Sequence, residues 1–111
     1  MKSFARIVED SNQYLVVLED QQRVIGTLQL SFIPYLTYQG GVRAQIEAVR
    51  IHNDYRGQGL GEQLFGWAIE TARAEGAHLV QLTTDKKRPE ALRFYEKLGF
   101  VASHEGMKLH L

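Results

Sequence analysis

The feature of this sequence that most constrains its fold is a glycine-rich loop at residues 56–61, which reads Arg-Gly-Gln-Gly-Leu-Gly. A strand-like segment precedes the loop and a helix-like segment follows it. Glycine lets the backbone approach a bound group closely, and the first N–H groups of a helix lack partners within the helix. Arg56 adds a guanidinium that can bind phosphate oxygens through two donors. Strand, loop and helix in this order predict a site for a phosphate-bearing ligand.

The loop differs from two common phosphate-binding loops. The dinucleotide fingerprint requires a third glycine where this chain has Glu62. The nucleoside triphosphate loop ends in Gly-Lys-Ser or Gly-Lys-Thr, whereas Gly61 is followed here by Glu62 and Gln63. The glycines alone therefore leave two interpretations open, a site for another phosphate ligand or a tight turn that binds nothing.

The segments ahead of the loop favour antiparallel strands. Residues 14–18 and 24–33 are rich in apolar residues and are separated by a polar turn at 19–22, which predicts a hairpin. A loop at 35–41 then leads to residues 44–51. That last segment alternates only in part and carries charged residues on both faces, so it is strand-like but irregular.

The segments after the loop favour a crossover. Apolar residues at spacings of three and four predict a helix over 61–75, which Gly76 ends. The remaining expected elements are a strand at 78–84, a helix from Pro89 to Leu98, and two last strands at 100–103 and 107–111. This order predicts a mixed α/β domain, with a mostly antiparallel sheet and one central strand–helix–strand crossover.

Composition limits the classes of partner and site. A chain of 111 residues makes one domain, spanning 1–111. Its formal net charge is zero, so no general attraction to nucleic acid or to a membrane surface is expected. It has no cysteine, and its four histidines lack metal-ligand spacing, so no metal site is predicted. No apolar run approaches the roughly 20 residues of a membrane span, and a cytoplasmic location is expected.

Two motifs resemble those of the GNAT family of N-acetyltransferases. Residues 56–61 are similar to the family's coenzyme A motif, Gln/Arg-x-x-Gly-x-Gly/Ala, and Asp54-Tyr55 resembles its usual lead-in. Residues 91–100, Ala-Leu-Arg-Phe-Tyr-Glu-Lys-Leu-Gly-Phe, resemble the family's Ala-x-x-Phe-Tyr-x-x-x-Gly-Phe. The resemblance covers about residues 13–103, with the elements in the same order. It implies the acyl-CoA N-acyltransferase fold.

The resemblance also implies the reaction, which is transfer of an acetyl group from acetyl-CoA to a primary amine of a small molecule or protein. Acetyl-CoA is then the cosubstrate, and no metal takes part. The family commonly has Asn three residues before the Ala of the second motif, where this chain has Arg88, so Arg88 is expected to take over that coenzyme contact. The implied coenzyme-binding residues are Val49, Ile51, Arg56, Gly57, Gln58, Gly59, Leu60, Gly61 and Arg88.

Two residues are expected to carry the chemistry. The family's tyrosine at the place of Tyr95 often lies near the thioester sulfur and protonates the departing thiolate; the other interpretation is a core tyrosine on the helix. A primary amine with a pKa of about 10.4 is mostly protonated at neutral pH, so a base helps it to attack. Glu47 is the candidate base, because its strand leads into the loop, although a surface carboxylate explains it equally well.

The front of the chain departs from the family. Members usually have another strand and one or two helices before the residues that correspond to Tyr14, whereas here only 4–10 precede them, interpreted as the end of such a helix. The domain is therefore expected to be short or truncated at its N-terminus. The apolar side chains left uncovered would then favour a homodimer; they are Val16, Leu18, Leu28 and Leu30.

Three functions remain open from the sequence. The first is an active N-acetyltransferase, the second is a coenzyme-binding or assembly module without acceptor chemistry, and the third is a fragment of a larger acetyltransferase. The sequence does not identify the acceptor.

Overall fold

The computed structural model describes residues 2–10, 12–34, 41–57 and 59–111, with side chains described from residue 12 onward. Gln58 and the loop residues Tyr35 to Gln39 and Gly40, singled out above, lie outside this set. The elements are β1 (Lys2–Asp10), β2 (Gln13–Asp20), β3 (Arg23–Pro34), β4 (Val42–Ile51), the 3-10 turn η2 (Asn53–Tyr55), α1 (Leu60–Ala74), β5 (Leu79–Gln81) and α2 (Pro89–Lys97).

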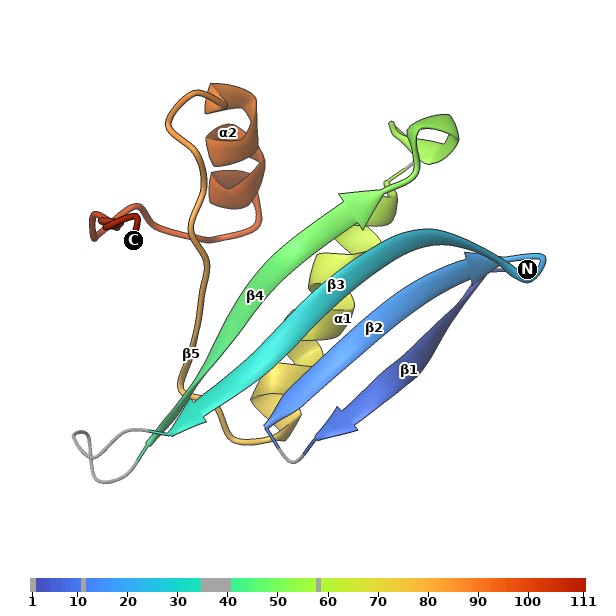
Figure 1. Cartoon of the computed structure of the whole chain (residues 1–111), viewed down its shortest axis with the longest axis horizontal. Coiled ribbons are helices and arrows are strands. Elements are labelled where there is room, and N and C mark those ends of the chain that lie inside the picture. Colours follow the sequence, from blue (N-terminus) through green and yellow to red (C-terminus); the bar gives the residue numbers. More distant parts are fainter. Residues whose placement is uncertain (1, 11, 35–40, 58) are drawn as a thin grey trace.

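The five strands form one sheet in the order β1-β2-β3-β4-β5, and α1 lies against one face of it (Figure 1). The pairs β1–β2, β2–β3 and β3–β4 are antiparallel, whereas β5 pairs parallel to β4 after the crossover through α1. The predicted mixed α/β sheet with a central strand–helix–strand crossover is thus confirmed.

Local sequence signals set the turns and the helix ends. Gln21 and Gln22 both have positive φ, of 51° and 68°, which is the two-residue turn whose twist matches a hairpin. Gly76 and Gly99 have φ of 85° and 106° and follow the two helices. After each helix, the N–H two residues past the cap bonds back to the last turn; these bonds join Ala77 to Ala72 at 3.0 Å and Phe100 to Tyr95 at 3.1 Å.

The front of the domain differs from the expectation. Residues 4–10 are not the end of a helix, because they belong to β1, which pairs with β2 from Lys2↔Asp20 to Asp10↔Gln13. Only two residues separate these strands, so no helix lies between them. The apolar pattern of 4–10 is short enough to suit either element, and pairing with β2 decides it.

The predicted uncovered apolar face is also wrong. Val16, Leu18, Leu28 and Leu30 are 1%, 1%, 0% and 0% exposed. They share one core with the buried stripe of α1, which includes Leu64 and Phe65. The helix therefore covers this face of the sheet without help from a second copy.

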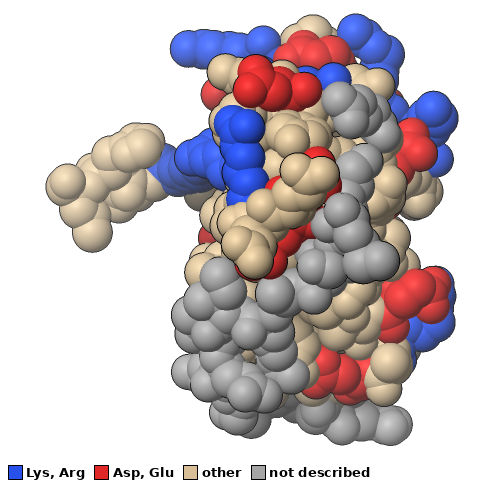
Figure 2. All heavy atoms as spheres, turned by 90° about the vertical axis from the view of Figure 1, so that its right-hand side faces the viewer, with Lys and Arg blue, Asp and Glu red and all other residues tan. Residues whose placement is uncertain are grey.

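The two last strands predicted at 100–103 and 107–111 do not form. β5 spans only three residues, and no described strand pairs with its outer edge. Residues 101–111 are all exposed, and an arm of mostly uncharged side chains stands clear of the molecule (Figure 2). In Figure 1 this segment, in red, turns away from the sheet.

Candidate functional site

The site is built around a β-bulge in β4. The pairs Thr27↔Arg50 and Gln29↔Glu47 bracket two residues of β4, Ala48 and Val49, that lie opposite the single residue between Thr27 and Gln29. Ala48 has φ of 54°, a left-handed conformation that costs about 1 kcal/mol or more outside glycine. The extra residue shifts the alternation of side chains, so Glu47 and Arg50, which strict alternation would place on opposite faces, line the same hollow.

Strands β4 and β5 separate beyond Gln45, ahead of the bulge. They pair only from Arg43↔Leu79 to Gln45↔Gln81, while β4 continues to Ile51. A hollow of about 290 Å³ lies in this region, and we call it the splay hollow. Its lining residues are Ile46, Glu47, Ala48, Val49, Arg50, Phe65, Leu82, Thr83 and Tyr95.

The splay hollow brings together the two residues expected to carry the chemistry. Glu47 is exposed, and its carboxylate accepts a hydrogen bond from Gln45 Nε2 at 3.1 Å. Tyr95 is half-buried, with its ring 5.5 Å from the ring of Phe65 and 6.2 Å from that of Phe100. Within the described part of the chain the Tyr95 hydroxyl makes no hydrogen bond, so it is available to a ligand in the hollow.

A second hollow, of about 350 Å³, lies at the glycine loop, and we call it the loop hollow. Gly57 and Gly59 have φ of 80° and 77°, which side chains rarely adopt, and Gly59 is the N-cap of α1. A Cβ on Gly61 would lie 3.4 Å from Phe94 Cζ, in contact with α2. Positive φ therefore accounts for Gly57 and Gly59, while Gly61 lies where α1 and α2 meet.

Of the two charged side chains that line the loop hollow, Glu62 has a charged partner and Arg56 has none among the described residues. Arg56 is exposed and its Nε donates to the backbone oxygen of Ile51 at 3.4 Å, while no carboxylate among the described residues pairs with it. Glu62, which also lines the hollow, lies 3.7 Å from Lys97 Nζ. The first N–H groups of α1 point to this end of the helix, so the hollow favours an anion.

Comparison with known proteins identifies the family. The family model for the acetyltransferase (GNAT) family matches residues 2–100. The chain belongs to the GNAT family. It is 33% identical over 100 residues to the aminoalkylphosphonate N-acetyltransferase of Salmonella typhimurium, covering 90% of this chain and 64% of that protein. It is 38% identical over 89 residues to the glucosamine 6-phosphate N-acetyltransferase of Trypanosoma brucei brucei, covering 80% and 58%.

The chain thus spans less than two thirds of the length of these two relatives. Among solved structures, it matches a protein described as a transcriptional regulator from Bacillus halodurans C-125, with a TM-score of 0.88 and 59% identity, over 93% of this chain and 69% of that one. It also matches an acetyltransferase from Trypanosoma brucei, with a TM-score of 0.82 and 35% identity, over 91% and 70%. The family resemblance and the fold it implied are confirmed.

Of the other residues predicted to bind the coenzyme in this GNAT domain, three line one of the two hollows and Arg88 lines neither. Val49 lines the splay hollow and Ile51 the loop hollow. Leu60 lines the loop hollow as well, but it is only 1% exposed, so its side chain anchors α1 in the core. Arg88 is the N-cap of α2, lines neither hollow, and has its Nε 3.5 Å from Glu90 Oε1.

Some lining residues of the GNAT domain were not singled out from the sequence. Arg50 and Thr83 line the splay hollow, and Tyr55 lines the loop hollow. Tyr55 had a signal, since it precedes Arg56 in the motif. Arg50 reaches the splay hollow beside Glu47 because of the bulge at Ala48, and the order of residue types does not show a bulge.

Among the described residues, no group of three or more His, Asp or Glu side chains has the geometry to hold a metal ion. Within the same ranges, no helix is both long and apolar enough to span a membrane.

Proposed function

We propose that this chain transfers an acetyl group from acetyl-CoA to a primary amine, in the cytoplasm. The observation that carries the proposal is that the loop hollow, which favours an anion, and the splay hollow, which holds Glu47 and Tyr95, are neighbours. Phe94 and Tyr95 are consecutive in α2 and line one hollow each, as Ile51 and Arg50 do in β4. One extended ligand can therefore place its pyrophosphate at the glycine loop and its thioester near Tyr95.

The proposed roles follow from the chemistry of the transfer. The amine nitrogen attacks the thioester carbonyl carbon, the carbon–sulfur bond breaks, the amine loses a proton and the thiolate gains one. Glu47 accepts the proton from the amine, directly or through water, and Tyr95 donates to the thiolate. A backbone N–H of Val49 or Ile51 stabilises the carbonyl oxygen as charge develops on it.

For the acceptor, we propose a small primary amine that also carries a phosphate or phosphonate group. The two relatives named above act on an aminoalkylphosphonate and on glucosamine 6-phosphate, which share this combination. In the splay hollow of this chain, Arg50 lies with Glu47, and within the described residues Arg50 forms no ion pair. A guanidinium can bind a phosphoryl group through two donors while the carboxylate faces the amine.

Thiol release from acetyl-CoA is expected to be fastest with the anionic amines. We expect kcat/KM to be about tenfold higher for glucosamine 6-phosphate than for glucosamine, because a hydrogen bond to a charged group contributes about 1.5–3 kcal/mol. Arg50→Gln should remove this preference and leave the activity with glucosamine unchanged. Coenzyme binding without thiol release from any amine would instead support a binding module without acceptor chemistry.

Loss of the Glu47 carboxylate is expected to lower kcat/KM for the amine most at low pH. Glu47→Gln should lower kcat/KM for the amine about 100-fold near pH 7, with a smaller loss toward pH 10, where the free amine needs no base. The measurement is a pH–rate profile of both proteins, with Glu70→Gln on the exposed face of α1 as the control. An equal loss at every pH would assign Glu47 a positioning role.

We further propose that the protein is a homodimer joined through residues 100–111. Met107, Leu109 and Leu111 alternate with polar residues, as in a strand with one apolar face, and are 94%, 85% and 115% exposed. The outer edge of β5 pairs with no described strand, and Leu79 on β5 is 42% exposed. Adding this segment of one copy to the β5 edge of the other would cover both.

Light scattering at low micromolar concentration should therefore give twice the mass of the chain. The double variant Met107→Lys and Leu109→Lys should be a monomer, because each buried side chain of this kind contributes about 1.5–3 kcal/mol. Val24→Lys, an exposed position on β3, serves as the control and should remain dimeric. A monomeric wild-type protein would contradict the proposal.

A further inference from the structure

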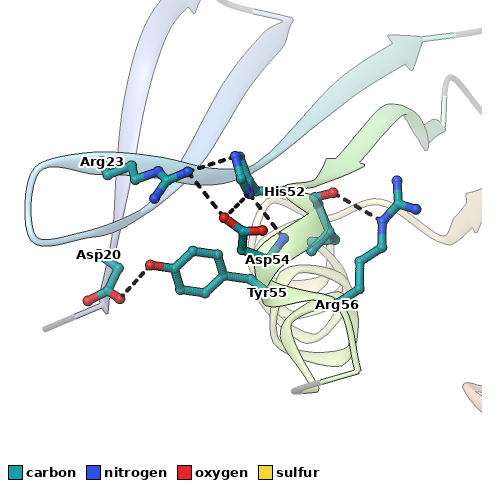
Figure 3. A network of polar contacts seen from close by, with 7 residues as sticks. Asp20, Arg23, His52, Asp54, Tyr55 and Arg56 are labelled. Atoms are coloured by element: carbon teal, nitrogen blue, oxygen red, sulfur yellow. Dashed lines mark hydrogen bonds and ion pairs between the residues drawn. The ribbon is translucent and has the colours of Figure 1, made fainter.

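Polar side chains connect the turn between β2 and β3 to the segment that leads into the glycine loop (Figure 3). The Tyr55 hydroxyl donates a hydrogen bond to Asp20 Oδ2 at 3.2 Å. Arg23 Nη2 donates to His52 Nε2 at 2.8 Å and lies 3.6 Å from Asp54 Oδ2. We call these five residues the turn network. They join segments about thirty residues apart in the sequence.

The turn network acts where the chain has little regular structure of its own. Among the described residues between Ile51 and Leu60, the only regular element is the three-residue turn η2. The His52 N–H donates to the backbone oxygen of Ile25 at 2.7 Å, which adds a backbone tie to β3. The Arg23 guanidinium also lies 5.9 Å from the centre of the Tyr55 ring. The start of the loop is therefore held by the hairpin β2–β3.

We propose that Asp20 and Arg23 are positioning residues for acetyl-CoA, an inference that rests on the proposed role of the loop hollow. Neither residue lines that hollow, whereas Tyr55 and the following Arg56 do. By fixing Tyr55, the turn network fixes where Arg56 and Gly57 begin before the coenzyme binds. Less conformational entropy is then lost on binding, so the effect falls on coenzyme affinity and not on the acetyl-transfer step.

His52 has a defined part in this network. Arginine can only donate, so Nε2 accepts from Arg23 at 2.8 Å, and a neutral imidazole has only one acceptor nitrogen. The Asp54 N–H, 3.2 Å from Nδ1, competes for the same ring at a longer distance. We therefore infer that the His52 ring accepts the hydrogen bond from Arg23, through Nε2, and not the one from the Asp54 N–H. The side-chain oxygen of a glutamine at this position can take the place of Nε2 and accept from Arg23. The side-chain oxygen of an asparagine extends only as far as Nδ1, so it cannot accept from Arg23.

The first test measures coenzyme A affinity by calorimetry and the steady-state constants of the full chain. Tyr55→Phe and Asp20→Ala should each raise Kd and the KM for acetyl-CoA about 3–10-fold, with kcat within twofold of wild type. Their double variant should be no worse than Asp20→Ala alone, because Tyr55→Phe removes a contact that Asp20→Ala has already removed. Asp20→Asn, which keeps an acceptor for the hydroxyl, should restore most of the affinity.

The same measurement separates the two contacts of His52. His52→Gln should keep the wild-type Kd within about twofold, and His52→Asn should raise it about 3–10-fold, as should Arg23→Gln. An unchanged Kd in Tyr55→Phe, Asp20→Ala and Arg23→Gln would overturn the inference.

Hydrogen exchange without ligand tests the turn network independently of the proposed function. The hydrogen-bonded amides of His52, Tyr55 and Arg56 should exchange about tenfold faster in Tyr55→Phe and Asp20→Ala, while those in the middle of α1 stay unchanged. If wild-type protein does not bind coenzyme A, the proposed function fails, and this exchange result still decides whether the network holds the loop. Unchanged exchange in both variants would overturn the inference.

Discussion

Gly59→Asp is expected to abolish the rise in melting temperature that coenzyme A gives this protein. For the wild type, ligand at about 100 times its dissociation constant should add about 2.7 kcal/mol to the free energy of unfolding. Gly59 lines the loop hollow as the N-cap of α1. An aspartate there places a carboxylate against the pyrophosphate, and its charge cancels the attraction of Arg56 and the helix N-terminus.

The protein should still fold with this change, at the cost of the backbone strain that a side chain at positive φ brings. A Cβ on Gly59 would meet no atom within 4 Å, and Asp and Asn accept a positive φ better than other side chains. Gly59→Asn is the matched control, since it has the same shape without the charge, and it should keep a measurable shift. The experiment is thermal unfolding of all three proteins with millimolar coenzyme A. A full shift in the aspartate variant would remove the glycine loop as the pyrophosphate site.

Features fixed by a few neighbouring residues could be predicted from the sequence. Gly76 and Gly99 end their helices because the chain needs a left-handed residue there, whatever surrounds it. The glycine loop is local in the same way, since Gly57 and Gly59 both have positive φ. The meeting of Glu47 and Tyr95 is not local. It came only from resemblance to the family, because 47 residues lie between Glu47 and Tyr95 in the sequence.

Features that depend on a distant partner could not be predicted. Residues 4–10 become a strand because β2 lies beside them, and the same pattern would also suit a short helix. Residues 107–111 alternate like a strand but pair with no described strand of this chain. The bulge at Ala48 is a third case, because it arises from a shifted register with β3, and it brings Arg50 into the splay hollow.

Tyr95→Phe is expected to lower kcat about 100-fold and to leave the KM for acetyl-CoA within about twofold. Only the hydroxyl that meets the leaving sulfur is lost, so the effect falls on the transfer step, and general acid catalysis typically contributes about 100-fold or more. The ring contacts with Phe65, Phe94 and Phe100 remain, because phenylalanine keeps the same ring. The melting temperature should accordingly change little.

The comparison with Tyr55→Phe makes this test specific. Both variants remove one phenolic hydroxyl, yet Tyr55 lines the loop hollow and Tyr95 the splay hollow. We expect opposite results, with KM raised and kcat kept for Tyr55→Phe, and kcat lowered and KM kept for Tyr95→Phe. Steady-state rates at saturating amine, measured by thiol release, give both constants. An unchanged kcat in Tyr95→Phe would leave Tyr95 as a packing residue of the aromatic cluster around Phe65, and the proton for the thiolate would have to come from water.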